Sequence, residues 1–151
     1  MAECIFCAIV AGRAPASVVH ASDRFLVFMD IFPAQDGHAL VIPRRHAPLL
    51  RDLAEEEAGA LFALSRRVAL ALPRAGLRAD GVNLLLNDGA AANQTVPHAH
   101  VHVVPRRRGD LGAIVARLAR RPLGRIFGPA PRVRLDQQAA AIAAALQVPR
   151  A

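Results

Sequence analysis

The sequence contains no lysine, tryptophan or tyrosine and only two cysteines among its 151 residues. It also lacks any uninterrupted apolar run near the roughly 20 residues that a membrane-spanning helix requires. The first residues show neither the basic segment nor the sustained apolar stretch of a signal peptide. We therefore expect a cytoplasmic protein with no membrane partner, in which a structural disulfide is disfavoured.

The absence of lysine makes every one of the 19 positive side chains an arginine, and these arginines are unevenly placed. Residues 1–100 contain 9 Arg and 10 Asp or Glu, whereas residues 101–151 contain 10 Arg and 2 Asp. The basic excess could attract phosphate-rich partners. A nucleic-acid platform, however, needs aromatic side chains interleaved with the arginines. Because that pattern is absent, we interpret the excess as solvated surface and expect no nucleic-acid partner.

Length and composition predict one domain with an apolar core, since 54% of the residues are hydrophobic. Short apolar and β-branched stretches, separated by turn-forming residues, predict five strands. These strands are expected at residues 17–20, 25–30, 38–43, 82–87 and 97–105. Together with the helices described next, they predict an α+β fold built on a five-stranded antiparallel sheet.

One short and one long helix are expected among these strands. The short helix covers residues 5–10 and ends at Gly12. Between the third and fourth strands, Asp52 and Glu55 have the spacing of a capping box at the start of the long helix. Pro73 should end or kink this helix because it lacks an amide hydrogen. The apolar stripe expected to face the core consists of Leu53, Leu61, Leu64, Val68 and Leu72.

The character of the sequence changes after the last strand. Residues 110–121 carry apolar side chains on one face and arginines elsewhere, which predicts an amphipathic helix. Gly and Pro in residues 128–131 should break it, and the Ala-rich residues 136–147 predict a further helix. We therefore divide the chain into a first domain, residues 1–110, and a helical C-terminal extension, residues 111–151.

Three of the six histidines lie in one five-residue window, at His98, His100 and His102. Side chains alternate along a strand, so these three point to one face while the apolar residues between them point into the core. Placing three imidazoles on one face of an otherwise apolar strand costs free energy, which indicates that these histidines have a function. It could ligate a metal, supply a nucleophile with supporting histidines, or bind phosphate without chemistry. The C-x-x-C spacing of Cys4 and Cys7 similarly indicates either a redox pair or half of a metal site.

The sequence His-Ala-His-Val-His-Val-Val at residues 98–104 resembles the signature of the histidine-triad (HIT) family. Further blocks resemble the family in collinear order, at residues 4–9, 28–31, 37–46, 83–89, 94–97 and 105–110. The resemblance covers residues 3–110 and is closest to the bacterial histidine-triad nucleotide-binding branch, whose members often hydrolyse adenosine phosphoramidates. It implies a purine nucleotide hydrolase or transferase that cleaves a bond to the α-phosphate.

The resemblance also implies a covalent mechanism. His100 matches the nucleophile, whose Nε2 attacks the α-phosphorus and forms a nucleotidyl-histidine. His38 matches a histidine that orients His100, while His102 matches a phosphate contact and proton source. Thr95 completes the catalytic set, and Asp30 matches the carboxylate that binds the ribose hydroxyls. The residues that match nucleotide-binding positions are Ile5, Phe6, Ile9, Phe28, Asp30, Ile31, Leu40, Asn87 and Gln94.

A structural zinc ion, no organic cofactor and a homodimer are further implications of the resemblance. Cys4, Cys7, His46 and His98 match the four zinc ligands of many bacterial members, and two thiolates with two imidazoles suit tetrahedral zinc. Two other functions remain beside a phosphoramidase. One is a dinucleoside polyphosphate hydrolase or phosphorylase, and the other is a non-catalytic AMP-binding regulatory protein.

Overall fold

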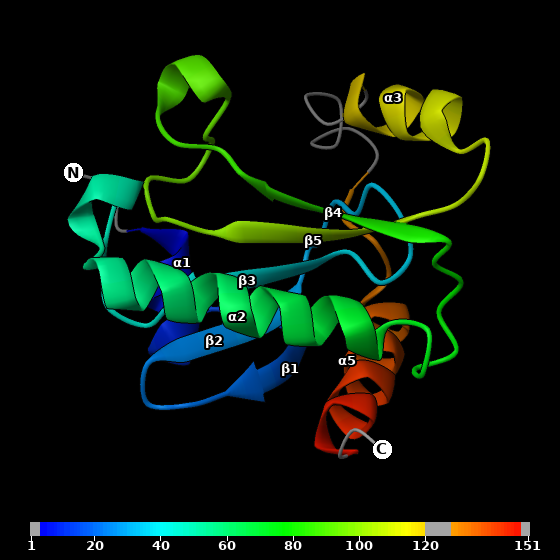
Figure 1. The fold of residues 1–151 in the computed structure, drawn as a ribbon, viewed down its shortest axis with the longest axis horizontal. Coiled ribbons are helices and arrows are strands. Elements are labelled where there is room, and N and C mark those ends of the chain that lie inside the picture. The colour runs from blue at the N-terminus through cyan, green and yellow to red at the C-terminus, as the bar shows by residue number, and fades with distance from the viewer. Residues whose placement is uncertain (1–3, 120–127, 149–151) are drawn as a thin grey trace.

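A single antiparallel sheet of five strands, in the order β1-β2-β3-β5-β4, forms the centre of the structure (Figure 1). This computed structural model describes residues 4–119 and 128–148. The strands are β1 (Val18–Ala21), β2 (Phe25–Met29), β3 (Ala39–Pro43), β4 (Gly81–Leu86) and β5 (Val101–Arg106). The helices are α1 (Ile5–Val10), α2 (Glu55–Ala71), α3 (Leu111–Ala119) and α5 (Arg132–Gln147), with short 3-10 helices at Leu50–Asp52 and Ala90–Ala92. The predicted α+β fold is confirmed.

The two faces of the sheet bury different side chains, because successive residues of a strand point to opposite sides. On one face, Val27 and Val41 belong to the core cluster that α2 covers. On the other face, Phe28 and Leu40 pack with Phe6 of α1. In Figure 1, α2 lies in front of the sheet and α1 lies behind it. Both faces of β2 and β3 are therefore buried, and the α1 side carries the candidate site described below.

All five residues of the predicted apolar stripe are buried, but only Leu61, Leu64 and Val68 lie within α2, since Leu53 precedes the helix and Leu72 caps its end. The predicted capping box is wrong. Helix α2 begins only at Glu55, and Asp52 lies in the preceding 3-10 helix, where its carboxylate accepts a hydrogen bond of 2.8 Å from the Leu49 amide. The helix ends just before Pro73, as expected, and Gly76 has a φ of 72° in the turn that follows.

The last strand begins later than the predicted residues 97–105, after the first two histidines of the triad. The backbone just before Val101 forms its hydrogen bonds outside the sheet. Pro97 has no amide hydrogen, and the Ala99 amide donates to the Ala47 carbonyl, outside the sheet, at 2.6 Å. The expected alternation nevertheless holds, because Ala99 and the two inward-facing valines of β5 are buried in the core.

Of the helices that follow β5 in the described parts of the chain, α5 joins the core and packs against β1, β2 and α2 (Figure 1). Its buried residues are Leu135, Ala139, Ile142 and Ala145. It begins directly after Pro131, earlier than the predicted residue 136. The other helix, α3, occupies most of the predicted segment 110–121, whose last two residues lie outside the described structure. Within the described parts of the chain, no helix combines the length and apolarity needed to cross a membrane.

Candidate active site

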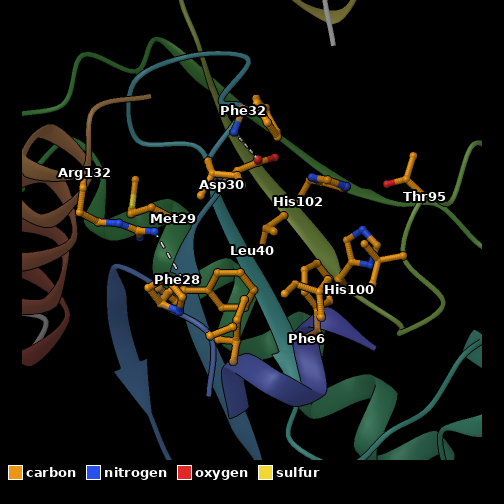
Figure 2. A pocket seen from close by; sticks show the side chains of 17 residues that line it. Phe6, Phe28, Met29, Asp30, Phe32, Leu40, Thr95, His100, His102 and Arg132 are labelled. Atoms are coloured by element: carbon orange, nitrogen blue, oxygen red, sulfur yellow. Dashed lines mark hydrogen bonds between the residues drawn. The ribbon is translucent and has the colours of Figure 1, made fainter. Parts of the chain in front are cut away.

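A cavity of about 630 Å³ lies beside α1, on the face of the sheet that Phe6 covers. Its wall comes from α1 and the loop after it, β2 and the loop after it, β3, β5 and the segment before it, and the first residue of α5. Figure 2 shows Thr95, His100 and His102 grouped at one end of the cavity and Arg132 at the other, with Asp30 and Leu40 between them. The predicted site residues that line it are Ile5, Phe6, Ile9, Phe28, Asp30, Ile31, Leu40, Thr95, His100 and His102.

The apolar part of the wall is built around two phenylalanines. Phe6 and Phe28 meet edge to face, with ring centroids 5.4 Å apart, and Phe6 meets the His100 ring in the same way at 5.2 Å. Ile5 and Ile31 stand at the cavity with 49% and 38% of their surface exposed. Apolar side chains left exposed at a concave surface are typical of a ligand site. The cavity therefore fits a ligand with a large apolar face.

His100 is oriented by the backbone of its own segment. Its Nδ1 lies 2.6 Å from the His98 carbonyl oxygen. A carbonyl can only accept, so Nδ1 carries the hydrogen and donates. In the neutral ring, Nε2 then holds the lone pair. Because the His100 side chain lines the cavity while only 3% exposed, it is arranged to act as a nucleophile toward a bound ligand.

A chain of hydrogen bonds orients His38 and His102. The Ala34 amide donates to His38 Nδ1 at 3.1 Å, so the hydrogen of the His38 ring is on Nε2. That Nε2 lies 3.0 Å from His102 Nδ1, to which it donates, and 3.5 Å from Asp30 Oδ2. In neutral His102, the remaining hydrogen is therefore on Nε2, and His102 lines the cavity as a hydrogen-bond donor.

The structure thus pairs His38 with His102, and a hydrogen bond that orients His100 comes from the backbone. Three of the predicted catalytic and nucleotide-binding residues are not among the described residues that line the cavity: His38, Asn87 and Gln94. Gln94 bonds within its own region, donating to the Pro48 carbonyl at 2.7 Å and accepting from the Gly89 amide at 2.8 Å. The roles assigned to these three residues stay predictions.

A second cluster lies beside the cavity and consists of Cys4, Cys7, His46 and His98. One ligand atom from each side chain lies within 4.8 Å of all the others. Cys7 Sγ is 3.3 Å from His46 Nδ1 and 3.7 Å from His98 Nδ1, and Cys4 Sγ is 3.6 Å from His98 Nδ1. A tetrahedral ion bonded at about 2.3 Å to sulfur and about 2.1 Å to nitrogen spaces such ligands about 3.6 Å apart. The four side chains are therefore able to hold a metal ion.

His98 presents the nitrogen that such a cluster needs. Its Nε2 donates to the Pro43 carbonyl at 2.8 Å, which leaves the lone pair on Nδ1, facing both thiols. Burial lowers the pKa of His98, and His46 and His100 lower it further, against the opposing effect of the Pro43 hydrogen bond. The ring is thereby kept neutral, as metal binding requires. A backbone carbonyl bonded to the other ring nitrogen is a common partner of metal-binding histidines.

Sequence reasoning missed two polar contributions to the site, and also six further lining residues: Ala14, Pro15, Ala16, Met29, Phe32 and Val96. The His98 carbonyl carries no signal in the sequence, because every residue has a carbonyl. Arg132 lines the cavity from the C-terminal extension, and its only signal was the arginine excess that we interpreted as solvated surface. That interpretation also omits the ion pairs of Arg106 with Asp110 and of Arg134 with Asp36.

The fold and this arrangement of histidines define a histidine-triad protein, and comparisons with known proteins agree. The HIT domain family matches residues 11–109. A HIT-like protein of Mycobacterium tuberculosis is 45% identical over 107 residues, which cover 71% of this chain and 74% of the relative. The chain belongs to the HIT family.

Three further likenesses bear on the site. An adenosine 5'-monophosphoramidase of Schizosaccharomyces pombe is 36% identical, covering 73% of this chain and 79% of the relative. An adenylylsulfatase of Arabidopsis thaliana is 34% identical, covering 73% of this chain and 54% of the relative. The crystal structure of a zinc-bound histidine triad family protein from Mycobacterium smegmatis is 40% identical with a TM-score of 0.78, covering 95% of this chain and 93% of that one.

Proposed function

We propose that this protein hydrolyses purine nucleoside phosphoramidates by cleaving the bond to the α-phosphorus, through a nucleotidyl-histidine on His100. The observation that carries the proposal is the tautomer of His100. Its Nδ1 is held by the His98 carbonyl, so Nε2 carries the lone pair in a ring that lines the cavity. A neutral imidazole in this state is a good nucleophile and is regenerated easily.

The reaction proceeds in two steps. His100 Nε2 forms a bond to the α-phosphorus as the bond to the leaving nitrogen breaks, and that nitrogen takes up a proton from solvent and departs as the neutral amine. The His100 ring then carries a positive charge, and its Nδ1–H remains bonded to the His98 carbonyl, which stabilises that charge. Water next attacks phosphorus and releases a proton to solvent, the bond between His100 Nε2 and phosphorus breaks, and His100 returns to its neutral form. Splitting the displacement in this way replaces one difficult step by two easier ones.

The other residues of the cavity bind and orient the nucleotide. His102 Nε2–H donates to a phosphate oxygen or to the leaving atom, and the exposed Thr95 hydroxyl lies at the same end of the cavity (Figure 2). Asp30, whose Oδ1 already accepts from the Phe32 amide at 2.8 Å, accepts from the ribose hydroxyls. The apolar slot around Phe6 and Phe28 holds the base.

The names of two relatives support this reaction class. The names adenosine 5'-monophosphoramidase and adenylylsulfatase both describe the cleavage of a group from an adenylyl unit. The two activities share attack at the α-phosphorus and differ in the leaving group. Our proposal places the leaving group of this protein among amines, and the first experiment varies that group directly.

The test compares turnover of adenosine 5'-phosphoramidate, adenylyl sulfate and diadenosine tetraphosphate by wild type and His100→Ala. We expect the phosphoramidate to be cleaved fastest, and rapid quenching with mass spectrometry to find a nucleotidyl adduct on His100 in the wild type. Cleavage of only the tetraphosphate would keep the nucleophile but change the substrate class. If wild type cleaves none of them yet binds AMP, the protein is a binding module and the proposal fails.

We also propose that Cys4, Cys7, His46 and His98 hold a structural zinc ion. Two thiolates and two neutral imidazoles at tetrahedral spacing suit zinc. The ion would tie α1, which carries the base-binding Phe6, to the loop after β3 and to the segment that carries His100. Its contribution is to stability, and metal analysis of the purified protein tests it.

A homodimer is the third proposal. Strand β4 is at the edge of the sheet, and Leu85 within it is 50% exposed. An edge strand with exposed apolar side chains offers a self-complementary surface for a two-fold partner. Light scattering of the purified protein measures the mass directly.

A further inference from the structure

The C-terminal helix α5 supplies a cation to the cavity. Arg132 is its first residue and lines the cavity, although it lies beyond residues 11–109, which match the HIT domain family. The Ala130 amide donates to the Ile31 carbonyl at 2.8 Å, which attaches the segment before α5 to the chain just after Asp30. The helix is therefore fixed against the site, and its first side chain has a defined place there.

The guanidinium of Arg132 is oriented by the buried Ser17 hydroxyl and by one exposed backbone carbonyl. Its Nη1 donates to Ser17 Oγ at 3.1 Å and its Nη2 donates to the Pro15 carbonyl at 3.4 Å. Ser17 is 3% exposed and in turn donates to Asp136 Oδ1 at 2.6 Å. Within the described residues these bonds use two of the five guanidinium hydrogens, so three remain for a ligand. An arginine held in this way is preorganised for recognition.

The position of Arg132 along the cavity identifies what it faces. Figure 2 places Arg132 near Phe28 and Met29, at the opposite end from His100 and Thr95. This step rests on the proposed function, which puts the phosphorus at His100 and the ribose at Asp30. The far end of the cavity then receives the edge of the base, whose faces pack on the phenylalanines.

A guanidinium has only donors, so it discriminates between purines by their edges. Guanine presents two acceptors side by side, O6 and N7, which a guanidinium binds with two parallel hydrogen bonds. Adenine presents the N7 acceptor next to the N6 amino group, which is itself a donor. An arginine at the edge of the base therefore favours guanine. With adenine, one N–H group of the guanidinium would face the N6 amino group, which is also a donor. We propose that Arg132 makes this site select guanine nucleotides over adenine nucleotides.

Calorimetric titration with GMP and with AMP tests this proposal without requiring turnover. A bidentate arginine contact to guanine corresponds to discrimination of about tenfold or more, so we expect the wild type to bind GMP at least about tenfold more tightly than AMP. Arg132→Met removes the guanidinium at similar length, and Arg132→Lys keeps the charge but not the paired donors. Both variants should bring the two dissociation constants close together, mainly by weakening GMP.

Arg134→Met is the matched control. Arg134 lies on the same turn of α5 and pairs with Asp36, but it is not among the described residues that line the cavity. It should keep the preference for GMP. Equal binding of GMP and AMP by the wild type overturns the proposal, and so does loss of the preference in Arg134→Met to the same degree as in Arg132→Met. Because the ratio is measured within each variant, a general loss of stability does not imitate the effect.

Binding and turnover separate this proposal from the one on which it rests. Equal binding of both nucleotides together with phosphoramidate turnover overturns the role of Arg132 and leaves the hydrolase intact. Selective GMP binding without turnover of guanosine or adenosine phosphoramidate supports Arg132 and overturns the hydrolase. Absence of binding to either nucleotide overturns both.

Discussion

His98 and His100 are separated by one residue, yet the backbone gives them opposite tautomers. His98 donates from Nε2 to the Pro43 carbonyl and presents Nδ1 to two thiols. His100 donates from Nδ1 to the His98 carbonyl, so Nε2 carries the lone pair in a ring that lines the cavity. Both residues are histidines and both rings are almost fully buried, so the difference between them comes from neither residue type nor exposure. Two backbone carbonyls, those of Pro43 and His98, therefore direct the lone pair of one histidine toward the cysteine cluster and leave the lone pair of the other on Nε2, the atom that we propose as the nucleophile.

The same comparison shows why the two sites can share a short segment. The His98 backbone orients His100, while the His98 side chain belongs to the cysteine cluster. A substitution at residue 98 removes an imidazole but keeps the carbonyl. The two tasks are therefore separable by mutation, and each of the following predictions attacks one side of the comparison.

The largest effect is expected from His100→Ala. Loss of a covalent nucleophile should lower turnover of the phosphoramidate by about 10⁴-fold or more, because no other group replaces Nε2 in the first step. Nucleotide binding should persist, since the apolar wall and Asp30 are unchanged. Steady-state kinetics and calorimetry with the product nucleotide measure the two effects. Turnover within tenfold of wild type would remove His100 from the mechanism.

His98→Ala should produce the opposite pattern, with a large loss of stability and a smaller loss of turnover. Removing this fully buried side chain leaves a cavity and takes one ligand from the zinc ion that we propose ties α1 to the sheet. We expect the free energy of unfolding to fall by about 3 kcal/mol or more, measured by urea denaturation. A chelator should destabilise the wild type but hardly affect the variant. An equal response of both proteins to the chelator would exclude His98 as a ligand.

Much of this arrangement is predictable from the sequence, because it depends on patterns of residue type. The uninterrupted apolar runs of β2 and β3 indicate strands that are buried on both faces, and the predicted apolar stripe identifies the buried face of α2 together with the residues that flank it. The histidine row and the two cysteines mark both sites. These features can be predicted because burial and strand periodicity depend on the type and spacing of side chains, which are read from the sequence.

Other features depend on the backbone or on distant contacts. Asp52 has the spacing of a helix cap, but the 3-10 turn at Leu50–Asp52 uses its carboxylate for the Leu49 amide. The backbone before β5 is directed away from the sheet by the hydrogen bond from the Ala99 amide to the Ala47 carbonyl, which no local pattern reveals. Arg132 reaches the cavity because Leu135 and Ile142 dock α5 on the core. Composition marks α5 as a helix but does not say where it packs.

His38→Ala should have an intermediate effect on catalysis. Without the Nε2–H of His38, His102 is free to adopt the other tautomer and to present a lone pair where a donor is needed. We expect kcat to fall about 10- to 100-fold, as for other partners that orient a functional histidine, with little change in nucleotide binding. His38→Gln should lose less, because its amide can still donate toward His102. His20→Ala, on β1 and outside the described cavity wall, is the matched control and should behave as wild type.

The smallest effect is expected at the ion pair between Arg106 and Asp110, which lies outside both histidine sites. It allows the pH dependence of stability at this pair to be separated from that of the histidine sites. Hydrogen bonds from Arg106 and from the Arg107 amide lower the pKa of Asp110 from 3.8 to about 2. Because the pKa is lower in the folded state, this pair contributes stability above about pH 4. That contribution is lost as the pH falls from about 4 to about 2.

Asp110→Asn, which cannot ionise, should therefore lose less stability than wild type over that interval, and the two proteins should show parallel pH dependence above it. Urea denaturation at pH 2.5, 4 and 6 gives the comparison. Any loss of stability on acidification above about pH 4 is, by contrast, expected from the cysteine cluster, whose ligands must be deprotonated to hold the proposed metal ion. It should occur equally in Asp110→Asn and be absent from His98→Ala. If Asp110→Asn changed the pH dependence of stability above about pH 4, the ion pair would be coupled to the cluster, and the two regions could not be treated as independent.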